Sequence, residues 1–352
     1  MTGADGVEHL LHTLRAQGRF CAGAGSPMYG ELFELVATDV EAGGVFATVL
    51  CGHEDDPSRD AVPLRLLGGL HRMVLDGRAP SLRRWYPSTG GSWDATAAWP
   101  DIVRTATTHT DELRAALALP PQTNEVGRSA VLIGGLLCIN HEFGLPVRLF
   151  EIGSSAGLNL RADHYHYRYP GSTWGPADSP VTIDNAWNGQ LPPPGTVRIV
   201  ERHGYDVAPI DVTGADGELT VLSYIWPDQR ARLQRLRGAI TVARKVPAQL
   251  ERRTAADGVA RLKLTEGALT VLWHSITWQY LGDDERAVVR GRVEELSAQA
   301  GPGSPFAHLT LEPARDGPGS PLRFLVRAAT WPDGQRGILG ECHAHGPPVD
   351  WR

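Results

Sequence analysis

Cysteine is scarce and widely spaced in this 352-residue sequence, and other features are missing as well. The four cysteines form no CxxC pair and no regular spacing, which excludes a disulfide framework and a cysteine-based zinc site. The 34 basic and 40 acidic residues give a net charge of -6 without a long Lys/Arg run, so we expect no nucleic-acid partner. No apolar run reaches spanning length, and the first residues, M-T-G-A-D-G-V-E-H-L-L, do not show the basic and then apolar pattern of a secretion signal. We therefore expect a cytoplasmic protein with no membrane partner, and the composition says nothing about oligomeric state.

The first part of the chain has the apolar spacing of helices. Apolar residues recur at intervals of three and four, and glycine and proline fall between these runs. The predicted helices cover residues 7–17, 28–40, 64–75, 102–117 and 125–143. Residues 45–50 are the one stretch here that favours a short strand. We expect a helical N-terminal domain over residues 1–145.

After Pro146 the pattern changes to short β-branched runs that alternate with helical stretches, as in a parallel sheet with crossover helices. Late strands close an antiparallel hairpin through the turn W-P-D-G-Q, and a Pro/Trp-rich segment at about 165–196 looks like an ordered insertion. We expect an α/β, Rossmann-like domain over residues 146–352. Its predicted strands are 147–152, 197–202, 249–254, 269–274, 308–311, 322–328 and 337–343, and its predicted helices are 155–164, 229–244 and 284–300.

The stretch F-E-I-G-S-S-A-G-L-N, at residues 150–159, fits two catalytic signatures. Gly153, Ser155 and Gly157 match the G-x-S-x-G elbow that exposes a serine nucleophile in α/β-hydrolases. The same residues also match the turn after the first strand of a nucleotide-binding domain, where glycines let the backbone approach a cofactor. An elbow needs an oxyanion-hole loop on an earlier strand, but the preceding residues are predicted to be helical. Context therefore favours the nucleotide-binding interpretation.

A nucleotide-binding domain also needs an acid after its second strand, to accept hydrogen bonds from a ribose diol. The stretch V-R-I-V-E-R-H-G-Y-D-V-A-P supplies Asp206, with Glu201 as a competitor. The number of residues between Gly157 and Asp206 is much larger than in a dinucleotide-binding fingerprint, which argues against a plain NAD-binding domain. The predicted insertion accounts for the additional residues.

The motif E-I-G-S-S-A-G-L-N and the loop G-Y-D-V-A-P together resemble class I S-adenosylmethionine-dependent methyltransferases. The resemblance implies that the glycine turn contacts the methionyl part of the cofactor and that Asp206 holds its ribose. It further implies a polar residue near the adenine, for which Asp257 is the candidate, and residues facing the reacting methyl in W-H-S-I-T-W-Q-Y-L. The implied cofactor contacts are Glu151, Gly153, Ser154, Ser155, Gly157, Asn159, Asp206 and Asp257. The implied catalytic residues are His274, as a general base, and Tyr280.

The whole chain is also similar to a bacterial family of unknown function that is frequent in actinobacteria. The stretches G-S-P-M-Y, Q-T-N-E-V-G-R-S, Y-I-W-P-D-Q and W-H-S-I-T-W-Q-Y-L carry this resemblance, together with the glycine motif. One departure from the methyltransferase pattern is that Ser155 stands at the second glycine position of the turn. A serine there leaves less room for a cofactor.

Several polar and aromatic residues outside the glycine motif are candidates for contacts with a substrate. Arg128 can clamp a carboxylate of substrate or cofactor, and a capped, solvated helix start is the alternative explanation for its segment. The predicted substrate contacts are Tyr29, Asn124, Glu125, Arg128, Trp226, Ser275 and Trp278. Two His pairs, His164 with His166 and His343 with His345, lack a third ligand at metal-site spacing, so we expect no metal.

These observations favour a methyltransferase that uses S-adenosylmethionine and a small-molecule acceptor bound between the helical and Rossmann-like domains. Three alternatives remain open at this point. The same cofactor could cyclise or donate its aminocarboxypropyl chain, releasing methylthioadenosine. The protein could also bind the cofactor without catalysis, or it could be a serine hydrolase that uses Ser155.

Overall fold

The computed structural model describes residues 3–118, 120–317 and 319–352, and the chain forms two compact units. Unit 1 contains Met1–Thr123 and Ala215–Leu233, and unit 2 contains Asn124–Gly214 and Gln234–Arg352. The domain boundary predicted at residues 145 and 146 therefore falls inside unit 2. The segment 215–233 leaves the sheet-containing unit and joins the first one, which sequence spacing did not indicate.

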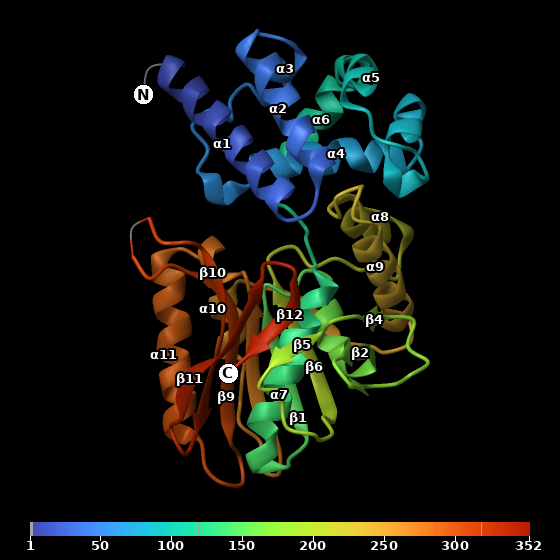
Figure 1. The fold of residues 1–352 in the computed structure, drawn as a ribbon. Coiled ribbons are helices and arrows are strands. Elements are labelled where there is room, and N and C mark those ends of the chain that lie inside the picture. Colours follow the sequence, from blue (N-terminus) through green and yellow to red (C-terminus); the bar gives the residue numbers. More distant parts are fainter. Residues whose placement is uncertain (1–2, 119, 318) are drawn as a thin grey trace. The chain divides into compact units, whose positions relative to one another are not determined.

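All regular elements in the described part of unit 1 are helical (Figure 1). Its helices are α1 (Gly3–Gly23), α2 (Pro27–Glu41), α3 (Val45–Leu50), α4 (Val62–Leu75), α5 (Ala95–Thr108), α6 (Thr110–Leu117) and α8 (Ala215–Ser223), with short 3-10 segments η1 (Ser58–Asp60), η2 (Pro80–Trp85) and η3 (Pro87–Thr89). The helix predicted over residues 102–117 is divided between α5 and α6 at His109.

The strand considered for residues 45–50 is wrong, because this segment forms α3. Phe46, Val49 and Leu50 are its buried residues, and their spacing of three and four places them on one helical face. The carboxylate of Asp39 accepts a hydrogen bond from the Phe46 backbone N–H at 2.7 Å, which satisfies one of the free donors at the helix start.

Unit 2 has a mixed α/β fold built on a large, mostly parallel sheet of nine strands. Its strand order is β5-β12-β11-β10-β9-β8-β1-β6-β7, in which β7, β6, β1, β8 and β9 are parallel neighbours. Strands β9 to β12 then pair antiparallel. The strands of this sheet are β1 (Val147–Ile152), β5 (Trp187–Gly189), β6 (Ile199–Asp206), β7 (Gln249–Arg252), β8 (Leu269–Ser275), β9 (Phe306–Ala314), β10 (Arg323–Trp331), β11 (Arg336–His343) and β12 (Gly346–Trp351).

Each strand predicted after Pro146 has a counterpart in this sheet, and the predicted late hairpin is the antiparallel pair β10 and β11. Strand β12 was not predicted. The predicted insertion is ordered: it holds β5 and a small second sheet of β2 (His166–Tyr169), β3 (Ser172–Trp174) and β4 (Thr182–Ile183). The helix expected over residues 155–164 is instead the 3-10 helix η5 (Leu158–His164).

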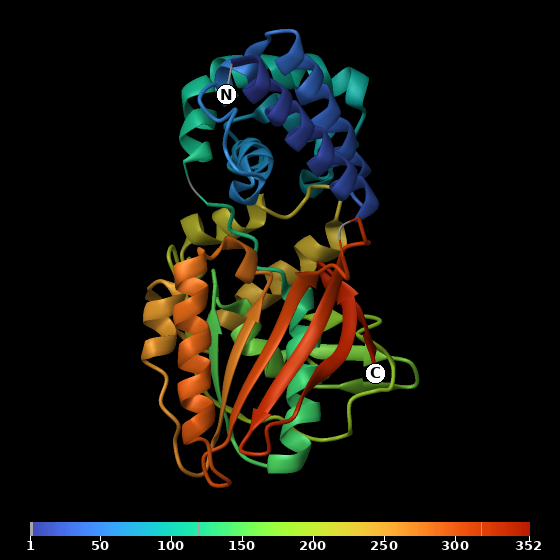
Figure 2. The ribbon, with the colours of Figure 1, turned by 90° about the vertical axis from the view of Figure 1, so that its left-hand side faces the viewer.

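Helices cover both faces of the large sheet (Figure 2). On one face, α10 (Ala255–Ala260) and α11 (Asp283–Gln299) share an apolar core with Phe150, Leu272 and Phe306 of the strands. On the other face lies α7 (Ser129–Phe143), preceded by the 3-10 segment η4 (Val126–Arg128); a Cβ on Gly135 of α7 would meet Leu309. Helix α9 (Arg230–Ala243) begins in unit 1 and ends in unit 2. Because side chains alternate along a strand, neighbouring residues of one strand reach different helices.

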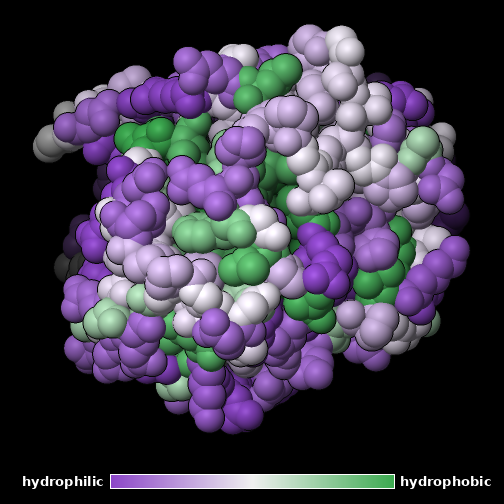
Figure 3. All heavy atoms as spheres, turned by 90° about the horizontal axis from the view of Figure 1, so that it is seen from below, coloured by the Kyte–Doolittle hydropathy of each residue, from purple (hydrophilic) through white to green (hydrophobic). Residues whose placement is uncertain are grey.

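The surface seen from below in Figure 3 is mostly polar, with small separate groups of apolar residues. Scattered apolar residues of this kind are normal on protein surfaces and mark no docking site by themselves. Among the described residues, we find no helix whose length and apolar character would allow it to span a bilayer.

Candidate functional site

The glycine motif forms a tight turn at the carboxyl end of β1, a central strand of the sheet. Gly153, Ser155 and Gly157 all have positive φ, of 68°, 49° and 62°. A side chain at Gly153 would collide with Thr277, which follows β8, and one at Gly157 would collide with Leu250 of β7. Both glycines are therefore required by the packing of the turn against neighbouring strands. Part of the space that the sequence assigned to a cofactor is filled by Thr277.

Asp206 lies beside this turn, at the carboxyl end of β6. Its Oδ2 accepts a hydrogen bond from the Ser155 N–H, and its Oδ1 accepts one from the Ala208 N–H, both at 2.8 Å. Asp206 as a whole residue is partly exposed. Each carboxylate oxygen has further acceptor capacity, so Asp206 can bind hydroxyl groups of a ligand while it holds the turn.

Replacement of Ser155 should show how much strain the turn carries. A residue with a Cβ is disfavoured at φ of 49°, whereas glycine adopts this region freely. We expect the free energy of unfolding of Ser155→Gly to be about 1 kcal/mol larger than that of Ser155→Ala, so the glycine variant should be the more stable. Both variants lack the hydroxyl, so their difference in urea unfolding isolates the backbone contribution. Equal stabilities would show that Ser155 is not strained.

Glu151 is buried, with 2% of its surface exposed, and it lies on the face of the sheet that α7 covers. Burial raises its pKa to about 8, although the hydrogen bond from Trp273 Nε1 to Oε1, at 3.1 Å, and the charge of Arg128 oppose this shift. Its Oε2 is buried without a hydrogen-bond partner among the described residues. The carboxyl group is therefore mostly protonated at neutral pH.

The segment Q-T-N-E-V-G-R-S belongs to unit 2 from Asn124 onward and packs beside the glycine turn. Asn124 Oδ1 accepts a hydrogen bond from the Leu158 N–H at 2.8 Å. Arg128 donates from Nη1 to the Ser275 carbonyl at the end of β8 and from Nε to the Ala344 carbonyl. Glu125 is buried and accepts from the Gly127 N–H at 3.0 Å. The structure thus brings Asn124 and Arg128 to the same edge of the sheet as the turn.

His274 forms a buried polar cluster with two residues of β9. Its Nδ1 lies 2.6 Å from Glu312 Oε1, and its Nε2 lies 3.1 Å from Nε2 of His308. Glu312 Oε1 also accepts the backbone N–H groups of Thr277 and Trp278, at 3.1 and 3.3 Å. Burial, and then the charge of His274, lower the pKa of His308 to about 3. Both ring nitrogens of His274 therefore have hydrogen-bond partners within the protein.

Sheet geometry separates His274 from Glu151. His274 has the same parity along β8 as Leu272, which packs with α10 and α11, whereas Trp273 points to the opposite face and bonds to Glu151. The side chains of His274 and Glu151 therefore point to opposite faces of the sheet. The sequence prediction placed them in one cluster because it considered only that both follow strand ends.

The other predicted residues of unit 2 are divided between buried and exposed positions. Ser154 and Asn159 are buried, and the Oγ and Oδ1 atoms of these side chains lack a hydrogen-bond partner among the described residues. Trp278 stacks on the His274 ring with a centroid distance of 5.5 Å. Tyr280 is 49% exposed. Asp257 is exposed in the first turn of α10, where its N–H donates to Thr254 Oγ1.

Tyr29 and Trp226 both lie in the core of unit 1. Their ring centroids are 6.2 Å apart, and the Tyr29 hydroxyl donates to the Leu67 carbonyl. Asp228 joins the same two segments, because its carboxylate accepts from Ser26 Oγ at 2.6 Å and from the Met28 N–H at 3.1 Å. The stretches G-S-P-M-Y and Y-I-W-P-D-Q therefore pack against each other within unit 1. In the structure, Tyr29, Trp226 and Asp228 stabilise this contact.

Sequence reasoning missed Glu312, which organises the loop after β8. The predicted strand 308–311 stopped one residue before it. The sequence did place an acid, Glu312, at the carboxyl end of the strand after β8. The carboxyl ends of parallel strands meet at one edge of the sheet, so this position could have identified Glu312 as a neighbour of the loop after β8. In the observed register His274 lies opposite Thr310, so His308 and Glu312 flank it on the same face.

Within the described parts of the chain, no group of three or more His, Cys, Asp and Glu side chains is arranged to hold a metal ion. Asp163, from one of the two His-containing segments, instead forms an ion pair with Arg202 at 2.6 Å.

Comparison with known sequences identifies the family to which this chain belongs. Residues 11–351 match a family described as an uncharacterised protein conserved in bacteria, DUF2332. The chain belongs to the DUF2332 family. The match covers both units of this DUF2332 protein, including the glycine turn, Asp206 and the His274 cluster. No curated protein and no solved structure matches the chain.

Proposed function

We propose that this DUF2332 protein binds S-adenosylmethionine at the carboxyl edge of the unit 2 sheet and transfers its methyl group to a small-molecule acceptor. The observation that carries the proposal is the carboxylate of the partly exposed residue Asp206, held beside a turn of left-handed residues at the ends of adjacent parallel strands. An acid in this position suits the two hydroxyl groups of a ribose.

The topology of the sheet supports the same location. When the parallel strands are numbered along the chain, β7-β6-β1-β8-β9 reads 3-2-1-4-5, the order of a doubly wound sheet. The chain order reverses between β1 and β8, and in such sheets ligands bind outside the carboxyl ends of the strands at this point. We infer that the Rossmann-like methyltransferase fold suggested by the sequence applies to unit 2.

The residues at this edge suit the cofactor in part. Asp206 would accept hydrogen bonds from the ribose, and the backbone of Ser155–Gly157 would face the ligand, whereas Thr277 covers Gly153. When bound, S-adenosylmethionine supplies a methyl group that its sulfonium already activates, so alignment of the acceptor matters more than covalent help. We propose that His274 positions the loop from Ser275 to Tyr280 through Glu312 and does not act as the general base.

Calorimetry with S-adenosylmethionine tests the proposal directly. We expect the wild-type protein to bind, and methyl-labelled cofactor incubated with a bacterial small-molecule extract to yield S-adenosylhomocysteine and a labelled acceptor. Methylthioadenosine as the product would instead indicate cyclisation or aminocarboxypropyl transfer. Binding without any product would indicate a binding protein, and no binding would refute the proposal.

A serine hydrolase remains the second candidate because Ser155 has the positive φ of a strained turn. The structure gives His274 the partners Glu312 and His308, so that histidine is not paired with a serine. Labelling of Ser155 by a fluorophosphonate, without cofactor binding, would favour the hydrolase over the methyltransferase.

A further inference from the structure

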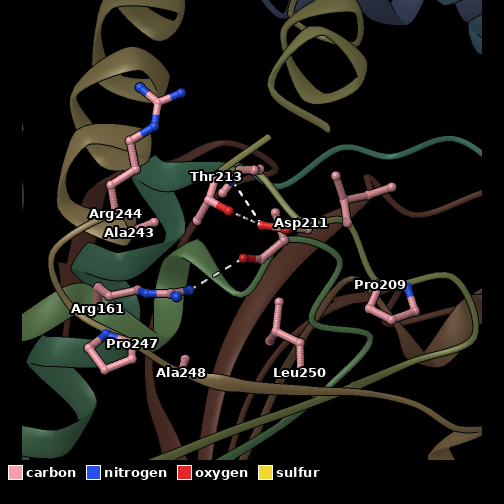
Figure 4. Close-up of a pocket in the computed structure, with 12 residues that line it drawn as sticks. Arg161, Pro209, Asp211, Thr213, Ala243, Arg244, Pro247, Ala248 and Leu250 are labelled. Atoms are coloured by element: carbon pink, nitrogen blue, oxygen red, sulfur yellow. Dashed lines mark hydrogen bonds between the residues drawn. The ribbon is translucent and has the colours of Figure 1, made fainter. Parts of the chain in front are cut away.

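Unit 2 contains a pocket of about 660 Å³ between the first half of η5, the loop after β6 and the segment that leads from α9 into β7 (Figure 4). Its walls are largely apolar and include Ala156, Pro209, Ile210, Pro247 and Leu250. A volume of this size lies within the usual range of small-molecule sites. The pocket borders the proposed cofactor site at Ala156, but Asp206 is not among its lining residues.

Arg161 gives the pocket an uncompensated positive charge. The residue is 5% exposed, and its side chain extends among the lining residues (Figure 4). Its Nε donates to the Val246 carbonyl at 3.0 Å, and its Nη1 donates to the carbonyls of Ala156 and Gly157, at 3.3 and 2.7 Å. Its Nη2 makes no hydrogen bond to the described residues.

The described residues supply no carboxylate within ion-pair distance of Arg161. Its neighbour Glu151 carries little negative charge at neutral pH, because burial raises the Glu151 pKa to about 8. Burial lowers the pKa of Arg161, and the positive charge of Arg202 also lowers it. A guanidinium nevertheless stays protonated in proteins, so this buried cation requires a partner.

The other charged residues of the pocket do not supply that partner. Asp211 is exposed and uses its Oδ1 to accept from the N–H and Oγ1 of Thr213. Arg244 is also exposed, and its side chain points away from Arg161 (Figure 4). The net charge of the lining residues is therefore positive, with the buried charge at Arg161.

We propose that this pocket binds a small amphipathic carboxylate, with the carboxylate on Arg161 Nη2 and an apolar body against Leu250 and the loop after β6. A carboxylate matches the guanidinium donors, and the apolar walls favour a ligand with hydrocarbon or aromatic surface. A bare inorganic anion would leave most of the 660 Å³ and its apolar lining in contact with water. The site is additional to the proposed cofactor site and does not depend on methyl transfer.

Calorimetry without S-adenosylmethionine tests this site, using 1-naphthylacetate and its neutral amide, 1-naphthylacetamide, as matched probes. We expect the wild-type protein to bind the acid at least about ten-fold more tightly than the amide, because only the acid can pair with the buried cation. Equal affinity for the two probes, or no binding of the acid up to millimolar concentration, would overturn the proposal.

Three variants locate the site. Arg161→Gln should weaken binding of 1-naphthylacetate at least about ten-fold, whereas the control Arg168→Gln, at an exposed arginine of β2 outside the pocket, should change it less than about two-fold. Since Arg161 also holds backbone carbonyls, Ala248→Trp provides an independent test by filling the pocket while Arg161 is kept. Ala248→Trp should abolish binding, and retained affinity in this variant would place the probe elsewhere and refute the site.

Discussion

Glu312→Ala is expected to destabilise unit 2 by about 3–5 kcal/mol, because it removes the acceptor of a buried network. The Glu312 carboxylate accepts hydrogen bonds from His274 Nδ1 and from the backbone N–H groups of Thr277 and Trp278. Without it, these three donors are left in a site where Glu312 is 8% exposed and His274 is 2% exposed. Urea unfolding of the full chain measures the change in free energy.

Glu312→Gln is the matched control, since its amide oxygen can still accept while its charge is removed. We expect Glu312→Gln to lower the free energy of unfolding less than Glu312→Ala does. Residues 276–280 should also be better protected from hydrogen exchange in Glu312→Gln than in Glu312→Ala. A loss below about 1 kcal/mol in Glu312→Ala would mean that the cluster does not hold the loop after β8.

Asp206→Asn is expected to weaken S-adenosylmethionine binding by about 10- to 100-fold, because hydrogen bonds to a charged acceptor contribute more than those to a neutral one. The asparagine keeps one oxygen, which can still accept from the Ser155 N–H, so the turn should persist. Calorimetry gives the affinity, and thermal unfolding shows whether the variant remains folded.

Asp211→Asn is the control for this substitution. Asp211 follows Asp206 in the same loop and also accepts from a backbone N–H, that of Thr213 at 2.9 Å, but it is exposed and its carboxylate makes no hydrogen bond to the glycine turn within the described residues. We expect the affinity of Asp211→Asn for S-adenosylmethionine to match that of the wild-type protein. Similar losses in both variants would indicate a general effect of loop charge and would contradict the assigned role of Asp206.

Local pattern explains which elements the sequence could predict. Strand β1 was predicted at the residues that the structure assigns to it, because V-R-L-F-E-I is a compact apolar run after a proline. The short run 45–50 was mistaken for a strand, since its β-branched residues fit either structure and only burial of Phe46, Val49 and Leu50 on one side selects the helix.

The candidate site was predictable in its position along the chain more than in its contacts. The sequence indicated the turn at residues 153–157 and an acid after the second strand, and the structure places Asp206 on the Ser155 N–H. It could not indicate that Tyr29 and Trp226 pack together in unit 1, because residues 215–233 leave unit 2 between two strands of its sheet. The transfer of a segment from one unit to the other leaves no periodic pattern in the local sequence, so it cannot be predicted from that pattern.

The sequence by itself determined the helical pattern within residues 7–117, the alternating strands and helices after Pro146, the glycine turn and its partner acid. Period and turn chemistry are local properties, so they can be read without the fold. Only the tertiary structure decided that both ring nitrogens of His274 have partners, that burial raises the pKa of Glu151, and that Arg161 faces a pocket without a carboxylate at ion-pair distance. These properties depend on strand register and burial, which bring together residues far apart in the chain.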